Sequence, residues 1–110
     1  MNQYQIAKFI SDDFELDVEV SPEEETVWLT KEQMSVLFGR DRSVISRHIR
    51  NIYLEHELQE EGTCAKNARV VHSLNRTYFE NIYNLDVVIS VGTVLNRKTA
   101  FFLENGRQKF

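Results

Sequence analysis

The stretch LFGRDRSVISRHIRNIY, residues 37–53, combines four arginines with aliphatic residues at helical spacing. At about 100° per residue, Ile45, Ile49 and Ile52 share one side of a helix, whereas the serines and arginines share the other. Residues 39–50 carry a net charge of +3 in a chain whose total is −4, so the remaining residues carry −7. The positive charge is therefore concentrated where a single helical face would present it.

Two helices are predicted around this stretch. Thr30 and Gln33 have the spacing of a capping box, which opens a first helix with an apolar stripe. Gly39 can adopt the left-handed conformation that ends this helix. Asp41 is a suitable N-cap for a second helix running from about Arg42 to Glu57. Two short helices joined by a glycine turn predict a helix-turn-helix over residues 30–57.

The polar face of the second helix is a candidate DNA-contacting surface. Arginines can bind guanine edges bidentately or hold phosphates, and serines near the start of a helix allow close approach to a groove. A helix with arginines on its polar face is more often only a solvated surface helix. Here the caps, the glycine spacing and the composition of the face all agree. The predicted contact set is Arg40, Arg42, Ser43, Ser46, Arg47, Arg50 and Asn51.

Residues 1–29 are predicted to form an N-terminal β-hairpin or sheet. FELDVEV (14–20) alternates apolar and acidic residues at period two, which is typical of a half-buried strand. SPEEE (21–25) is then expected as a turn and TVWL (26–29) as a returning strand, with residues 7–10 as a further strand. Acidic residues concentrate between 12 and 25. This segment is either a solvated edge or a repulsive wall that restricts how DNA can approach.

Residues 64–96 are predicted to form a β-hairpin followed by a helix. Two strands flank the polar turn SLNR (73–76), and Asn84 can cap the helix that follows. Lys66, Arg69 and Arg76 are candidate contacts of this hairpin if it acts as a wing, although a plain surface hairpin is equally compatible with the sequence. Residues 97–110 form a divergent tail, in which Phe101, Phe102 and Leu103 could support a dimer or pack on the core. The expected fold is one compact α+β domain resembling a winged helix-turn-helix, with a small antiparallel sheet and hairpins.

Other classes of function find little support in the sequence. The 110 residues suit one domain, and no apolar run is long enough to span a membrane. A single cysteine, Cys64, and the absence of a secretion-like start favour a cytoplasmic protein. His48 borders the apolar side of its helix, and His56 and His72 lack metal-like spacing. We expect no catalytic residues, no metal site, no cofactor and no small-molecule substrate.

The run ETVWLTKEQMSVLFGRDRSVISRHIRNIYLEHEL, followed by CAK and YNLDVVISVG, resembles the virulence RhuM family of bacterial proteins regarded as DNA-binding. The resemblance covers about residues 14–92 and implies a helix-turn-helix over residues 30–53. YNLDVVISVG is also similar to segments of phage antirepressor-type N-terminal domains, which implies a mobile-element origin. After Gly92 the sequence departs from the family pattern. We therefore expect a truncated member or one consisting of the N-terminal domain alone.

The sequence thus predicts a sequence-specific double-stranded DNA-binding protein, either a transcriptional regulator or an accessory of a mobile-element or restriction system. One recognition helix is a small interface, so a homodimer reading two half-sites is expected. The alternative is a protein-interaction module, such as an antirepressor or antitoxin-like adaptor that does not bind DNA. The acidic N-terminal segment and the negative total charge favour that alternative.

Overall fold

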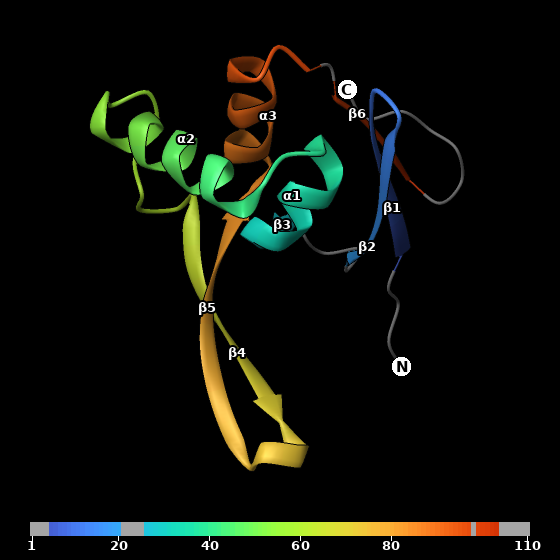
Figure 1. Ribbon diagram of the computed structural model, residues 1–110, viewed down its shortest axis with the longest axis vertical. Coiled ribbons are helices and arrows are strands. Elements are labelled where there is room, and N and C mark those ends of the chain that lie inside the picture. The colour runs from blue at the N-terminus through green and yellow to red at the C-terminus, as the bar shows by residue number, and fades with distance from the viewer. Residues whose placement is uncertain (1–4, 21–25, 98, 104–110) are drawn as a thin grey trace.

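The computed structural model describes residues 5–20, 26–97 and 99–103 (Figure 1). These residues form three α-helices and two three-stranded antiparallel sheets, so the expected α+β class is confirmed. In chain order the elements are β1 (Gln5–Ser11), β2 (Phe14–Val20), β3 (Trp28–Leu29), α1 (Lys31–Phe38), α2 (Arg42–Leu54), β4 (Cys64–Val71), the 3₁₀ turn (His72–Leu74), β5 (Arg76–Asn84), α3 (Leu85–Val94) and β6 (Thr99–Leu103).

The hydrophobic core lies between the three helices and the sheet residues that face them. Phe38 of α1, Ile45 of α2 and Val88 of α3 are wholly buried. β2 adds Val18 and Val20, which lie on its apolar face as the period-two pattern predicts. Because each helix contributes one apolar stripe to this core, its opposite face is left for solvent or a partner.

Local capping interactions build the turn between α1 and α2. Thr30 Oγ1 accepts from the Gln33 N–H at 3.1 Å, and Gln33 Oε1 accepts from the Thr30 N–H at 2.8 Å. Gly39 follows α1 with φ 62°, and the Asp41 side chain caps α2. The predicted capping box, glycine turn and N-cap are all confirmed.

α2 ends at Leu54, three residues before the predicted Glu57. His56 adopts φ 60°, and its N–H donates to the Tyr53 carbonyl, while the Glu57 N–H donates to the Ile52 carbonyl. This pairing satisfies the last carbonyls of the helix in the manner of a Schellman motif. Histidine occupies the position at which glycine is usual, so the sequence carried no glycine to mark the end.

The expected pairing of the N-terminal strands was wrong. β2 pairs with β1 through a two-residue turn, and β3 does not join them. Instead β3 pairs with β5, with Trp28 opposite Asn84 and Leu29 opposite Tyr83. An alternating pattern identifies a strand and its buried face, but it does not identify the partner strand. The turn predicted at 21–25 lies outside the described residues.

The tail predicted at 97–110 contains a strand of the N-terminal sheet. β6 pairs with β1 on the edge opposite β2, giving the order β2-β1-β6. Phe102 is half-buried there. Residues 99–103 therefore belong to this sheet and are not a separate segment, because the edge of β1 offers unpaired backbone groups that a strand can satisfy. Residues 104–110 lie outside the described part of the chain.

β4 and β5 form a long hairpin that projects away from the helices (Figure 1). Cys64 pairs with Tyr83 at its base and Val71 pairs with Arg76 near its tip. A 3₁₀ turn closes the hairpin, and Asn75 follows it in the left-handed conformation with φ 49°. The predicted strands on either side of SLNR are confirmed.

The turn at Gly39 yields a test of the fold. A Cβ at this position would overlap the ring of Phe14, in addition to the cost of its positive φ. We expect Gly39→Ala to lower the free energy of unfolding by about 2–4 kcal/mol, measured by urea denaturation. Gly62→Ala is the matched control, because Gly62 has φ 85° and a Cβ added to it would meet no atom within 4 Å. The control should lose only about 1–2 kcal/mol, and equal losses would show that the Phe14 contact adds nothing.

Candidate functional site

α2 presents a polar face to solvent, made of Ser43, Arg47, Arg50 and Asn51, which we call the arginine face. All four residues are exposed, whereas Ile45, Ile49 and Ile52 on the opposite side are at most 3% exposed. Burial of the isoleucine stripe fixes the rotation of the helix about its axis. The arginine face must therefore point outward, as the sequence predicted.

The backbone N–H groups at the start of α2 are hydrogen-bonded to the capping residue, Asp41. The Asp41 carboxylate accepts from the Ser43 N–H at 2.9 Å and from Ser43 Oγ at 2.6 Å. These two hydrogen bonds lower the pKa of Asp41, the side-chain bond contributing most. The Val44 and Ile45 N–H groups donate to the Asp41 carbonyl. The helix start therefore offers little to an external anion, and any recognition falls to the side chains further along.

The predicted arginines differ in their partners. Arg42 Nε lies 2.7 Å from Glu32 Oε1, and both side chains are more than half exposed. Arg40 is half-buried, and its guanidinium donates to the Gly39 carbonyl at 3.4 Å. Arg47 and Arg50 form no ion pair with any described residue. Of the four arginines predicted as contacts of the helix-turn-helix, these two are exposed and form no ion pair with the described residues.

The hairpin cations lie at different places along the ribbon. Paired residues share a face, so Lys66 lies opposite Asn81, while Arg69 lies opposite Tyr78 on the other face. Lys66 and Arg69 nevertheless line one hollow of about 340 Å³, together with Arg42. Arg76 lies near the tip, eight residues from the end of β5. The structure thus brings two of the three candidate wing residues near α2 and leaves the third far along the hairpin.

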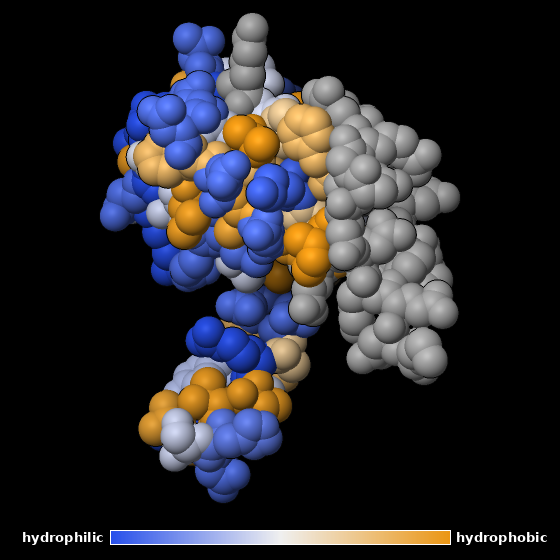
Figure 2. Space-filling model, turned by 90° about the vertical axis from the view of Figure 1, so that its right-hand side faces the viewer, coloured by the Kyte–Doolittle hydropathy of each residue, from blue (hydrophilic) through white to orange (hydrophobic). Residues whose placement is uncertain are grey.

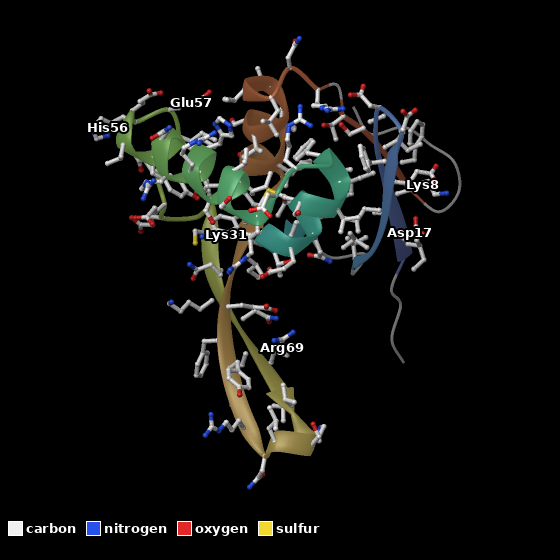
Figure 3. The ribbon with its side chains drawn as sticks, viewed as in Figure 1. Lys8, Asp17, Lys31, His56, Glu57 and Arg69 are labelled. Carbon is white, nitrogen blue, oxygen red and sulfur yellow. The ribbon has the colours of Figure 1, made fainter. Side chains whose placement is uncertain are left out.

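Lys31 belongs to this site but was missed by sequence reasoning. It is the first residue of α1 and lies at the junction of the helices and the hairpin (Figure 3). Its Nζ is 6.0 Å from the centre of the Tyr83 ring. It also lines a second hollow of about 400 Å³ with Ser46, Arg50 and Asn81. No local pattern marks Lys31, because its position depends on the pairing of β3 with β5.

The base of the hairpin is held to the helices by Tyr83 and Asn84. Tyr83 is 3% exposed. The Asn84 N–H donates to the Thr63 carbonyl at 2.9 Å, and its side-chain amide donates to the Gly62 carbonyl at 3.3 Å. Asn84 Oδ1 meanwhile accepts from the Val87 N–H and caps α3. One residue therefore couples the hairpin, the loop before β4 and the last helix.

Tyr83 generates a pH prediction. Burial is the main cause that raises the pKa of its phenol from 10.0 to about 12. Between these values the unfolded chain releases a proton that the folded chain retains, so the free energy of unfolding falls as pH rises. We expect this alkaline loss to be smaller in Tyr83→Phe than in the wild type, measured by urea denaturation between the two pKa values. If the free energy of unfolding falls equally with pH in the two proteins, the raised pKa of Tyr83 is not the cause of the alkaline loss.

Among residues 5–20, 26–97 and 99–103, no helix is long and apolar enough to cross a membrane. Comparison of the chain with protein-family models, with curated proteins and with solved structures found no match.

Proposed function

We propose that this chain is a sequence-specific double-stranded DNA-binding protein of the winged helix-turn-helix kind. In this proposal α2 enters the major groove and the β4–β5 hairpin is the wing. The observation that carries it is the arginine face, where Arg47 and Arg50 are exposed and form no ion pair with the described residues. A guanidinium can bind guanine O6 and N7 with two parallel hydrogen bonds, which is worth about 1–3 kcal/mol of discrimination.

The distribution of charge supports this proposal more than the total charge does. The exposed acidic side chains of the first hairpin, including Asp13, Glu15 and Asp17, lie on β2 and on the turn between β1 and β2. Figure 1 places these strands on the far side of α1 from α2. Their negative charge is therefore directed away from the arginine face. A duplex on the first turns of α2 would meet a locally positive surface, whereas the exposed Glu55, Glu57, Glu60 and Glu61 follow the end of the helix.

The cations of the hairpin also support a duplex bound along α2. Lys66 and Arg69 lie around the hollow that also includes Arg42 and Lys31, so cations extend from the start of α2 onto the ribbon. Such cations contact phosphates and hold the reading helix in register. The half-buried Ser46 and the exposed Ser43 are short enough to allow close approach of α2 to the groove.

We further propose that the chain is a member of the RhuM family, acts in the cytoplasm as a transcriptional regulator or mobile-element accessory, and binds as a homodimer. One short helix with a few base contacts gives limited affinity, whereas two copies read two half-sites about one helical turn apart. The proposal assigns no catalytic step to the chain.

The salt dependence of DNA binding tests the role of the arginine face. We expect the wild type to bind duplex DNA with an affinity that falls as salt rises, because bound cations release counterions from phosphates. The Arg47→Ala, Arg50→Ala double variant should weaken binding at every salt concentration. If both arginines bind phosphates, the slope should become shallower by about 2. An affinity loss without a slope change would assign them to base edges instead.

Lys8→Ala is the control for this experiment. Lys8 is exposed on β1, away from α2 (Figure 3), and its loss should leave both affinity and slope unchanged. Absence of wild-type binding at low salt would contradict the proposal. That result would favour the adaptor alternative, in which the chain binds a protein through the acidic surface of β1 and β2.

Glu32 supplies an independent prediction. Its ion pair with Arg42 is exposed, so it contributes at most about 1 kcal/mol to stability and can be broken by a phosphate. We expect Glu32→Gln to tighten DNA binding and to steepen the salt slope by up to about 1, because Arg42 then contacts phosphate without competition. The same titration measures this, and unchanged binding would remove Arg42 from the contact set.

A further inference from the structure

The outer half of the β4–β5 hairpin carries exposed apolar side chains on both of its faces. Four of the ten exposed large hydrophobic residues in the described part of the chain lie there: Val70, Leu74, Tyr78 and Phe79. Phe79 is the most exposed of the ten, at 69%. Figure 2 shows hydrophobic side chains gathered at the end of the projecting lobe, away from the helices. A surface of this kind on a projecting ribbon indicates contact with a partner.

The register of the hairpin places Phe79 on the face that leads to α2. Phe79 is paired with Ala68, whose small side chain leaves the aromatic ring uncovered. The next pair on this face toward the base is Lys66 with Asn81. Asn81 in turn lines the hollow shared with Ser46 and Arg50. One continuous surface therefore runs from the arginine face along the ribbon to the exposed phenylalanine.

The charge of the ribbon favours a nucleic acid as the partner. Residues 64–84 contain Lys66, Arg69 and Arg76 against Glu80 alone, a net charge of +2 in a chain of −4. Exposed aromatic rings among cations are suited to phosphates and bases together. Apolar side chains inserted between base steps are a common device of proteins that bind the minor groove.

The position of Phe79 along the ribbon is comparable with the spacing of the grooves. Phe79 lies four residues along β5 from Tyr83 at the base, about 13 Å at about 3.3 Å per residue. Adjacent major and minor grooves are roughly half of a 34 Å helical turn apart, or about 17 Å. With α2 in the major groove, the ribbon carries Phe79 most of the way to the flanking minor groove, and its side chain has to cover the remaining distance of about 4 Å. That groove is about 6 Å wide, which suits a single side chain and not a whole ribbon.

We propose that the β4–β5 hairpin is a DNA-bending arm, in which Phe79 enters the minor groove beside the site contacted by α2 and partly unstacks a base step. Lys66, which shares the face of Phe79, holds a phosphate on the way to this step. The inference rests on the proposed function, since it requires α2 to bind the duplex. It goes beyond that function by assigning the arm a specific action on the DNA.

The test measures bending and affinity together. A duplex of about 30 base pairs, far shorter than the persistence length, is labelled at both ends with a donor and an acceptor dye. We expect wild-type protein to increase energy transfer. Phe79→Ala should abolish the increase and weaken binding roughly tenfold, because base–aromatic stacking is lost. A 2-aminopurine placed along the flanking step should brighten with wild type and stay dark with the variant.

Val94→Ala is the control, because Val94 is also an exposed large hydrophobic residue, at 49%, but lies at the end of α3 and outside the hairpin. It should preserve both the bend and the affinity. Phe79→Leu should retain most of the bend, since leucine also acts as a wedge. Phe79 is exposed, so its loss should leave the fold intact, which circular dichroism and urea denaturation check.

The outcomes separate this inference from the proposed function. Binding without bending, or equal bending by wild type and Phe79→Ala, would overturn the proposal that the hairpin bends DNA. Neither result would contradict the proposed role of α2. A change in the association state of Phe79→Ala, with unchanged DNA bending, would assign the apolar tip to contact between copies of the chain and would also overturn the bending proposal. Absence of any wild-type binding would remove the proposed function and the arm together.

Discussion

The left-handed backbone at Gly39, held beneath the ring of Phe14, is the constraint on which the arrangement of the helices depends. It allows α1 to end and α2 to begin within three residues, and the Ser35 side chain secures the turn by donating to the Arg40 carbonyl. The direction of α2 follows from this turn. Because Ile45 is wholly buried on the opposite side of α2, the arginines are left on the outside, where a ligand can contact them.

The second determining feature is the base of the hairpin. A two-stranded ribbon that projects from its domain gains little stability from its own contacts, so its orientation depends on how its base is held. Here Tyr83 is buried against the helices, and Asn84 bonds to the loop before β4 while it caps α3. The ribbon therefore has a defined direction relative to α2. Because of this direction, the arginine face and the ribbon form one continuous surface.

Electrostatics at this surface are balanced and not simply positive. Asp41 is committed to the cap of α2, and Glu32 partly neutralises Arg42. Both acids lie at the edge where the helix would approach phosphates. In the proposed DNA complex, such acids would reduce unspecific attraction to DNA and would leave discrimination to Arg47 and Arg50, which form no ion pair with the described residues. Binding in that complex would then require side-chain contacts in addition to the phosphate attraction.

Local chemistry made much of the secondary structure predictable. The capping box at Thr30, the glycine turn, the caps at Asp41 and Asn84, and the alternation along β2 depend on residues a few positions apart, and all appear in the structure. The rotation of α2, and with it the exposure of Arg47 and Arg50, followed from the same periodicity. The early end of α2 was missed because histidine replaced the glycine that usually marks such an end.

The sequence by itself therefore determined the helices, most of the strands and the polar face of α2, because these features arise from interactions between near neighbours in the chain. Only the tertiary structure decided that β3 pairs with β5, that β6 joins β1, that Lys31 lies beside the hairpin and that Phe79 faces the side of α2. These choices depend on contacts between residues tens of positions apart. Backbone hydrogen bonds are alike in every strand, so the partner of a strand is set by how the whole core packs.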